Sequence, residues 1–187
     1  MPSKFRLLGL SGSLRRGSYS TAVLETLSAA VTARADTTVF DIGTLPHYDQ
    51  DRDGAVPPET VVELRRRITE VDGLVVVSPE FNYGIPGVLK NAIDWASRPA
   101  FASPLKGKPV LIVTCSPAFT GGVRAQSQLR ETFAATLSRQ VASPEVVIGQ
   151  VRDKIVDGRL IDRAALNFSL GAYEALFADI AAIRAAS

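Results

Sequence analysis

The chain has 187 residues, of which 46% are hydrophobic and 21% charged, and its formal net charge is +2. These values predict one folded domain over residues 1–187, exclude a largely disordered chain, and argue against a nucleic-acid partner because no long basic stripe is present. The single cysteine, Cys115, excludes an intrachain disulfide, and without a signal-peptide pattern or an apolar run of ~20 residues we expect a cytoplasmic protein with no membrane partner.

The first half of the chain alternates short apolar runs with longer amphipathic runs. Residues 5–10 predict a buried strand, and residues 37–40, rich in β-branched side chains, predict a second one. Between them, the apolar spacing from Tyr19 predicts a helix. Residues 41–58 form a long loop of the kind that is often functional, and residues 59–71 return to helical spacing.

The second half predicts three more strands. Residues 73–78 and 109–115 are apolar without alternation, as expected when helices cover both faces of a parallel sheet. The other expected elements are a strand at 146–148, helices over 86–97, 122–137 and 161–186, and a turn at Asp157-Gly158. Five strands alternating with helices predict right-handed βαβ units and one parallel sheet, an α/β fold.

Polar loops follow three of these strands, and ligands bind beyond the carboxyl ends of strands in such sheets. The first loop, residues 11–20, leads into a helix N-terminus, whose backbone N–H groups favour a phosphate. The guanidinium of Arg15 can add a charged contact, and the hydroxyls of Ser13, Ser18, Ser20 and Thr21 can donate hydrogen bonds. The alternative is a helix cap beside a solvated turn, because serine is common at helix starts.

The second loop, residues 78–87, sets Phe81 and Tyr83 on either side of Asn82, which suits a flat aromatic ring. The alternative is an ordinary strand-to-helix loop. The third loop, residues 116–122, ends in two glycines that let backbone approach a ligand, and N–H groups at the next helix start can stabilise negative charge. The alternative there is a flexible turn.

Together the three loops resemble those of the NADPH-dependent FMN reductase family, which includes chromate, quinone and azo reductases. The resemblance covers roughly residues 7–137. Its most specific segments are Pro79-Glu80-Phe81-Asn82 and the run Pro-Gly-Val-Leu-Lys-Asn-Ala-Ile-Asp-Trp at 86–95, supported by Gly12-Ser13-Leu14-Arg15 and Arg124-Ala125-Gln126.

This resemblance implies a flavodoxin-like, doubly wound five-stranded sheet of order 2-1-3-4-5 between helical layers, with FMN at the carboxyl ends of the strands. It also implies NADPH or NADH as hydride donor and a homodimer or homotetramer. The implied phosphate ligands are Ser11, Ser13, Arg15, Ser18 and Ser20. The implied ring contacts are Pro79, Glu80, Phe81, Asn82 and Tyr83, with Ser116, Gly121 and Gly122 on the pyrimidine side.

The chain departs from the family pattern at several of these positions. Ser20 stands where the family often has Asn, Phe81 replaces a usual Tyr, and Gly84 replaces Ser or Thr. The third loop carries Pro117, Ala118 and Phe119 in place of extra glycine. We expect these changes to alter the pocket around the ring while leaving the phosphate site in place.

We therefore expect an FMN-dependent NAD(P)H oxidoreductase that passes electrons by ping-pong turnover to a quinone, azo compound, free flavin or metal oxyanion. The alternatives are a flavodoxin-type electron carrier, against which the mild positive charge argues, and a non-catalytic FMN-binding scaffold. We interpret Cys115 as a core residue and His47, the only histidine, as a surface residue. Arg15 or Arg16 can contact a 2′-phosphate and favour NADPH.

Overall fold

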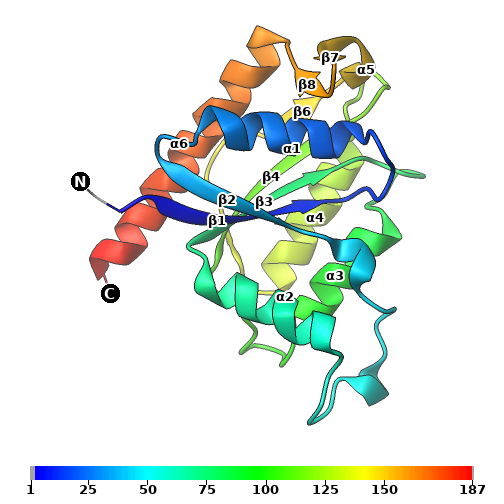
Figure 1. Ribbon diagram of the computed structural model, residues 1–187, viewed down its shortest axis with the longest axis vertical. Helices are drawn as coiled ribbons and strands as arrows, with labels where there is room; N and C mark the ends of the chain where they lie inside the picture. The colour runs from blue at the N-terminus through cyan, green and yellow to red at the C-terminus, as the bar shows by residue number, and fades with distance from the viewer. Residues whose placement is uncertain (1–2, 187) are drawn as a thin grey trace.

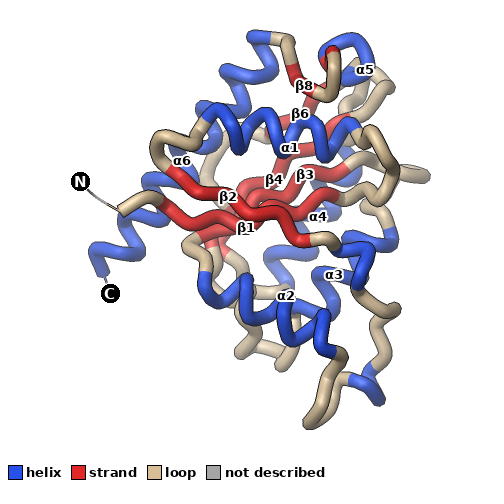
Figure 2. Tube along the Cα trace, viewed as in Figure 1, coloured by secondary structure: helices blue, strands red, loops and turns tan. Residues whose placement is uncertain are grey.

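The computed structural model describes residues 3–186 and shows one parallel sheet between two layers of helices (Figure 1, Figure 2). The strand order is β2-β1-β3-β4-β5, so the expected flavodoxin-like arrangement is confirmed. The longer strands are β1 (Phe5–Ser11), β2 (Ala35–Phe40), β3 (Gly73–Ser78) and β4 (Pro109–Cys115), each parallel to its neighbour.

Neighbouring residues of each strand belong to two separate cores, because successive side chains point to opposite faces of a sheet. Leu7 of β1 lies in one core and Leu8 in the other. The first core is covered by α1 (Tyr19–Ala30) and α6 (Arg163–Ala186), and the second by α2 (Glu59–Glu70), α3 (Gly87–Ala96) and α4 (Val123–Ala135). Burial on both faces explains why β3 and β4 are apolar without alternation.

The last position of the sheet differs from the single strand expected there. Two short strands, β5 (Arg139–Gln140) and β6 (Val146–Ile148), both pair with β4, the former at its start and the latter at its end. Pro144 lies between them and has no N–H for the ladder, which suits an edge position. The strand at 146–148 is confirmed, whereas a two-residue strand is too short to show a period in sequence.

The chain after β6 holds a short helix, α5 (Val151–Lys154), and a hairpin of β7 (Ile155–Val156) and β8 (Arg159–Leu160). Asp157 and Gly158 form its two-residue turn with φ of 49° and 73°, as two-residue hairpin turns require. The turn expected at these residues is thus confirmed.

Side chains of α3 hold the long loop between β2 and α2, which contains two short 3₁₀ turns, η1 (Ile42–Thr44) and η2 (Gln50–Arg52). The indole N–H of Trp95 and the amide of Asn91 both donate to the carbonyl oxygen of Pro46, at 2.8 and 2.9 Å. His47 follows directly and is exposed, so its interpretation as a surface residue is confirmed.

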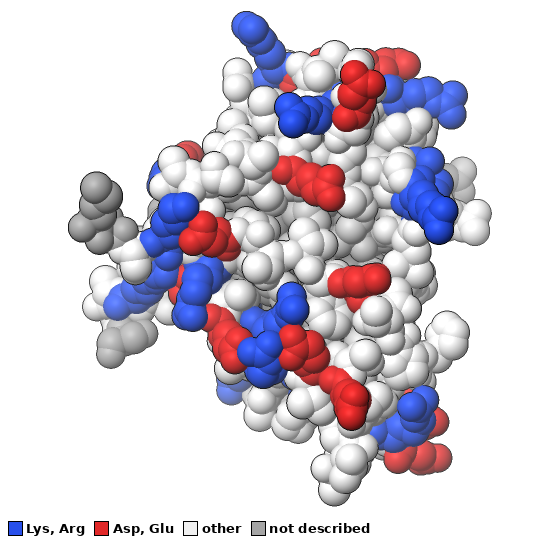
Figure 3. Space-filling model, viewed as in Figure 1, with Lys and Arg blue, Asp and Glu red and all other residues white. Residues whose placement is uncertain are grey.

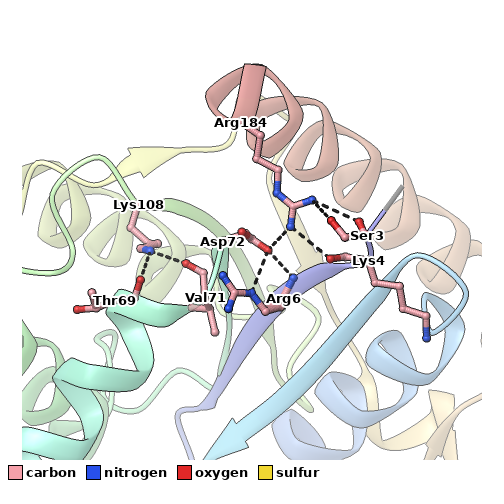
Figure 4. Close-up of polar contacts among 8 residues, drawn as sticks. All are labelled: Ser3, Lys4, Arg6, Thr69, Val71, Asp72, Lys108 and Arg184. Atoms are coloured by element: carbon pink, nitrogen blue, oxygen red, sulfur yellow. Dashed lines mark hydrogen bonds and ion pairs between the residues drawn. The ribbon is translucent and has the colours of Figure 1, made fainter. Parts of the chain in front are cut away.

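The amino end of the sheet is tied together by charged side chains (Figure 4). The Asp72 carboxylate accepts from the backbone N–H of Arg6 and the guanidinium of Arg184, both at 2.6 Å. Beside it, the ammonium group of Lys108 donates to the carbonyl oxygen of Val71, just after the end of α2. The first strand, the last helix and the end of α2 are therefore joined at this end.

Within residues 3–186, α6 alone is long and apolar enough, by length and composition, to cross a membrane: it has 24 residues and a mean hydropathy of 1.2 in its best window. Glu174 and Asp179 interrupt it, so the sequence shows no continuous apolar run there. The face of α6 with Tyr173, Leu176 and Ile180 packs in the first core, as the face of a core helix does.

The surface charge is mixed. Positive and negative side chains are interspersed over the face shown in Figure 3.

Candidate functional site

A cavity of about 260 Å³ lies where loops from the carboxyl ends of the strands meet. Six of the site residues expected from sequence line it, namely Ser13, Arg15, Ser18, Ser20, Pro79 and Phe81. Its remaining lining residues are Tyr19, Cys115, Pro117 and Arg152. The first and second loops thus meet as expected, and a fourth segment, α5, also contributes.

The start of α1 offers unpaired donors to this cavity. Ser18 is the N-cap residue, and its hydroxyl accepts from the backbone N–H of Thr21 at 3.4 Å. Within residues 3–186, the backbone N–H groups of Tyr19 and Ser20 have no acceptor, as expected for a first helical turn. The capping alternative is therefore correct for Ser18, and the same helix start still leaves two N–H groups for an anion.

The expected serine ligands of the first loop all have hydroxyls in contact with other groups of the protein. Ser11 shares a hydrogen bond of 2.8 Å with the hydroxyl of Thr21 and lines a neighbouring cavity, and Ser13 and Arg15 line both cavities. The hydroxyl of Ser20 lies 3.5 Å from the sulfur of Cys115, and that of Ser13 accepts from the backbone N–H of Arg15 at 3.3 Å. Ser13 is nevertheless the most open to a ligand, because it is half-buried, whereas Ser11, Ser18 and Ser20 are buried, and its hydroxyl proton remains free to donate.

The second loop is a tight turn that holds two aromatic side chains outward. The backbone groups of Phe81 and Gly84 exchange two hydrogen bonds, of 3.0 and 2.9 Å. Asn82 and Tyr83 between them have positive φ, a costly conformation for a bulky residue such as tyrosine. The guanidinium of Arg124 lies 3.9 Å from the centre of the Tyr83 ring and helps to hold it there.

The Glu80 carboxylate connects the second loop to α4. One of its oxygens accepts from the backbone N–H groups of Arg124 and Ala125, at 2.9 and 3.1 Å. Since the helix start favours a negative charge, Glu80 supplies that charge from within the chain. The expectation that N–H groups of this helix stabilise charge on a ligand therefore does not hold for these two groups.

Close backbone approach explains the glycines of the first and third loops. A Cβ on Gly12 would lie 2.6 Å from the hydroxyl oxygen of Ser78 and 3.1 Å from its Cα, so a larger residue would push the first loop away from the end of β3. Gly121 has φ of 62°, and a Cβ there would lie 2.8 Å from the backbone nitrogen of Gly149. Gly121, Gly122 and Ser116 do not line the cavity; the two glycines shape the loop that carries Pro117.

Cys115 closes the inner wall of the cavity. Its side chain is 1% exposed, which confirms it as a core residue, and burial raises its pKa to about 11. The thiol is therefore protonated at neutral pH and is a poor nucleophile. It gives the cavity an apolar, unreactive surface.

Arg152 lines the cavity but lies outside the three loops in which the sequence predicted the site. It follows β6, whose carboxyl end lies at the same edge of the sheet as those of β1, β3 and β4. The rule that ligands bind beyond the carboxyl ends of strands applies equally to this strand. Extending that rule to the fifth strand would have placed Arg152 at the site.

Comparison with known proteins gives consistent matches over nearly the whole chain. The profile of the NADPH-dependent FMN reductase family matches residues 5–153. An NAD(P)H-dependent FMN reductase of Pseudomonas aeruginosa is 39% identical over 166 residues, 88% of this chain and 89% of the relative. A quinone reductase of Escherichia coli is 38% identical over 177 residues, 91% and 93% of the two chains.

Among solved structures, a similar fold is found in FerB, a flavoenzyme NAD(P)H:(acceptor) oxidoreductase from Paracoccus denitrificans. The two structures superpose with a TM-score of 0.83 at 30% sequence identity, over 94% of this chain and 97% of that one. The three-loop architecture of the site is thus found on a scaffold shared with a flavoenzyme.

Proposed function

The chain belongs to the NADPH-dependent FMN reductase family, and from that premise we propose that it transfers electrons from NAD(P)H through FMN to a small acceptor, with a quinone as the first candidate. It is an oxidoreductase of the FMN reductase and quinone reductase type, with FMN and NAD(P)H as its cofactors. The acceptor, the order of the steps and the residues at the site belong to the proposal.

The observation that carries the proposal is the donor set at the start of α1. The free N–H groups of Tyr19 and Ser20, the hydroxyl of Ser13 and the guanidinium of Arg15 lie on one cavity. Such donors fit a phosphate monoester, which carries roughly −1.5 to −2 charges at pH 7. The residues present therefore fit the phosphate of FMN.

The second loop suits the aromatic part of the same cofactor. Pro79 and Phe81 line the cavity, and Phe81 is 58% exposed, so its ring is free to pack against a flat group. The hydrogen bonds between Phe81 and Gly84 fix the backbone from which this ring extends before any ligand arrives, which lowers the entropy lost on binding. In this proposal Asn82 and Tyr83, on the outer side of the turn, border the flavin ring.

When bound, FMN would supply the redox chemistry, with NAD(P)H as the source of hydride and a small molecule as the electron acceptor. The chain contributes binding, orientation and a partly apolar cavity, and its one thiol, Cys115, stays protonated and outside the reaction. We propose that donor and acceptor use the same exposed side of the site in turn, which gives ping-pong kinetics. Ser116, Gly121 and Gly122 would shape the third loop around the pyrimidine side.

We further propose that the protein works in the cytoplasm as a homodimer or homotetramer. A single buried cysteine suits a reducing compartment. An electron carrier of the flavodoxin type is the second candidate function, and the net charge of +2 disfavours it, because carriers often use acidic surfaces to dock basic partners.

The decisive experiment combines flavin binding with turnover. Purified protein is reconstituted with FMN, and the oxidation of NADPH and NADH is followed with benzoquinone, an azo dye, free flavin and chromate. Steady turnover with a quinone and parallel lines in double-reciprocal plots are expected. Retention of FMN without turnover would favour the carrier, and failure to retain FMN would favour a scaffold with a degenerate pocket.

A further inference from the structure

The backbone that carries Arg152 is fixed against the third loop. The N–H of Gln150 donates to the carbonyl oxygen of Ala118 and the N–H of Val151 to that of Ser116, each at 3.0 Å. The Val151 side chain is fully buried, and Gln150 has φ of 53°, a strained conformation for this residue type. Strain that the surroundings maintain is frequent at functional sites, and here it turns the chain so that the next residue lines the cavity.

The Arg152 side chain then reaches the start of α1. Its Nε donates to the hydroxyl of Tyr19 at 3.4 Å. The guanidinium of Arg15 lies 5.0 Å from the centre of the same ring. Since Tyr19 is the first residue of α1, both guanidinium groups lie beside the helix start that offers free N–H groups.

Neither cation at this cavity is neutralised by the protein. Within residues 3–186, Arg15 and Arg152 have no carboxylate within 4.0 Å, and the cavity lining contains no acidic residue. Eight other arginines do form such pairs, and six more in the described part of the chain do not, namely Arg16, Arg52, Arg98, Arg124, Arg159 and Arg163. What distinguishes Arg15 and Arg152 is that they line one cavity together. Both guanidinium groups line the cavity beside a helix N-terminus, so a dianion bound there would be attracted by both.

We propose that Arg152 is a second guanidinium ligand of the FMN phosphate, acting beside Arg15 with Tyr19 in contact with both. The inference rests on the proposed function and adds to it a binding residue from the last third of the chain. A phosphate at the start of α1 lies within reach of both arginines, because both line the cavity that Ser18, Tyr19 and Ser20 of that helix start also line. Guanidinium and phosphate form strong, charge-assisted hydrogen bonds.

The test compares FMN with riboflavin, which has the same ring but no phosphate. Dissociation constants are measured by quenching of flavin fluorescence for wild type, Arg152→Gln, Arg15→Gln and Arg16→Gln. Arg16 is exposed, lies in the first loop and does not line the cavity, so it is a matched control for the loss of one positive charge. Arg152→Lys tests whether charge alone suffices.

We expect Arg152→Gln to weaken FMN about tenfold, to change riboflavin less than twofold, and to leave the melting temperature unchanged. Arg16→Gln should leave both affinities near wild type, and the FMN effect should shrink as salt increases. Equal weakening of FMN and riboflavin, or an unchanged FMN affinity with a higher KM for NADPH but not NADH, would overturn the inference.

The two proposals can fail separately. If Arg15→Gln weakens FMN while Arg152→Gln does not, the flavin site stands and the role of Arg152 is wrong. If the wild type binds neither flavin, the proposed function fails and the role of Arg152 falls with it.

Discussion

The two ends of the parallel sheet treat their charged groups in opposite ways. At the amino end, Asp72 binds the backbone N–H of Arg6 and the guanidinium of Arg184 (Figure 4). At the carboxyl end, Arg15 and Arg152 line one cavity and have no carboxylate partner in the described part of the chain. The amino end pairs these charges internally, whereas the carboxyl end binds the Glu80 carboxylate at the start of α4 but leaves two arginines for a ligand.

Strained backbone, by contrast, occurs at both ends. Asn82, Tyr83 and Gln150 at the carboxyl end have positive φ values, and so does Leu137, just before β5 at the amino end; such values cost free energy in non-glycine residues. The difference between the two ends therefore lies in their charged groups. Substitutions at the amino end should therefore change stability and leave FMN affinity unchanged, whereas substitutions at the carboxyl end should change both.

The largest effect on stability is expected from Gly149→Ala, a substitution at the carboxyl end of the sheet. The added Cβ would lie 2.2 Å from the carbonyl oxygen of Phe119, so the third loop must move. We expect a loss of about 3 kcal/mol in the free energy of unfolding, the upper range for forced overpacking, and weaker FMN binding. Urea denaturation and flavin titration measure the two.

Gly87→Ala provides the control for that variant. Gly87 begins α3 at the same end of the sheet, and nothing lies within 4 Å of a Cβ there. It should be neutral or slightly stabilising, since alanine favours helices. If the Gly149→Ala protein were as stable as the Gly87→Ala protein, the third loop would be able to move without a loss of free energy of unfolding, contrary to this prediction.

Asp72→Ala, at the amino end of the sheet, is expected to cause the next largest loss of stability. Its side chain is 13% exposed and joins Arg6 to Arg184. Leaving these donors without their acceptor should cost about 2 kcal/mol, below the range for a fully buried pair. FMN affinity should stay within twofold of wild type.

Asp36→Ala is the matched control, because the carboxylate of Asp36 is 67% exposed and, among the described residues 3–186, forms an ion pair with Lys4 alone. Such a surface pair contributes at most about 0.5 kcal/mol. Should Asp72→Ala change FMN affinity tenfold, the two ends would be coupled and the division of roles would be incorrect.

Glu80→Ala tests the link between the second loop and α4. The variant leaves the N–H groups of Arg124 and Ala125 without their acceptor, and we expect a loss of about 1.5 kcal/mol, as for a removed helix cap. FMN should bind more weakly because the ring-binding turn loses its anchor. Glu80→Gln keeps an acceptor oxygen and should recover part of both losses; equal behaviour of the two variants would exclude capping as the cause.

Much of the fold could be predicted from sequence, because the apolar runs of β3 and β4 and the helical periods reflect burial on defined faces. The first two loops also met at one cavity as expected. The split of the last strand and the contribution of Arg152 could not be predicted from local pattern, since both depend on pairing with β4 and packing of α5 against the third loop. The role of Glu80 likewise depends on a contact 44 residues away along the chain.

The smallest predicted effect is on the pH dependence of the free energy of unfolding, to which one group at each end of the sheet should contribute with opposite sign. Burial raises the pKa of Cys115 from 9.0 to about 11, so between these values the unfolded chain has released a proton that the folded chain keeps. Stability therefore falls as pH rises, by about 1 kcal/mol between pH 8 and pH 10. Cys115→Ala should remove that part of the fall.

Lys108, at the amino end, should act with the opposite sign. Burial lowers its pKa below the ordinary 10.5, so below that pH the unfolded chain binds more protons than the folded chain, and stability rises as pH increases through this window. Lys108→Met should then make the overall decline steeper, while Cys115→Ala makes it shallower. Urea midpoints measured from pH 8 to pH 10 give the slope of stability against pH for each variant, whatever absolute stability the substitution costs. If both substitutions changed the slope in the same direction, the pKa shift of Cys115 or of Lys108 would have the opposite sign to the one expected from burial.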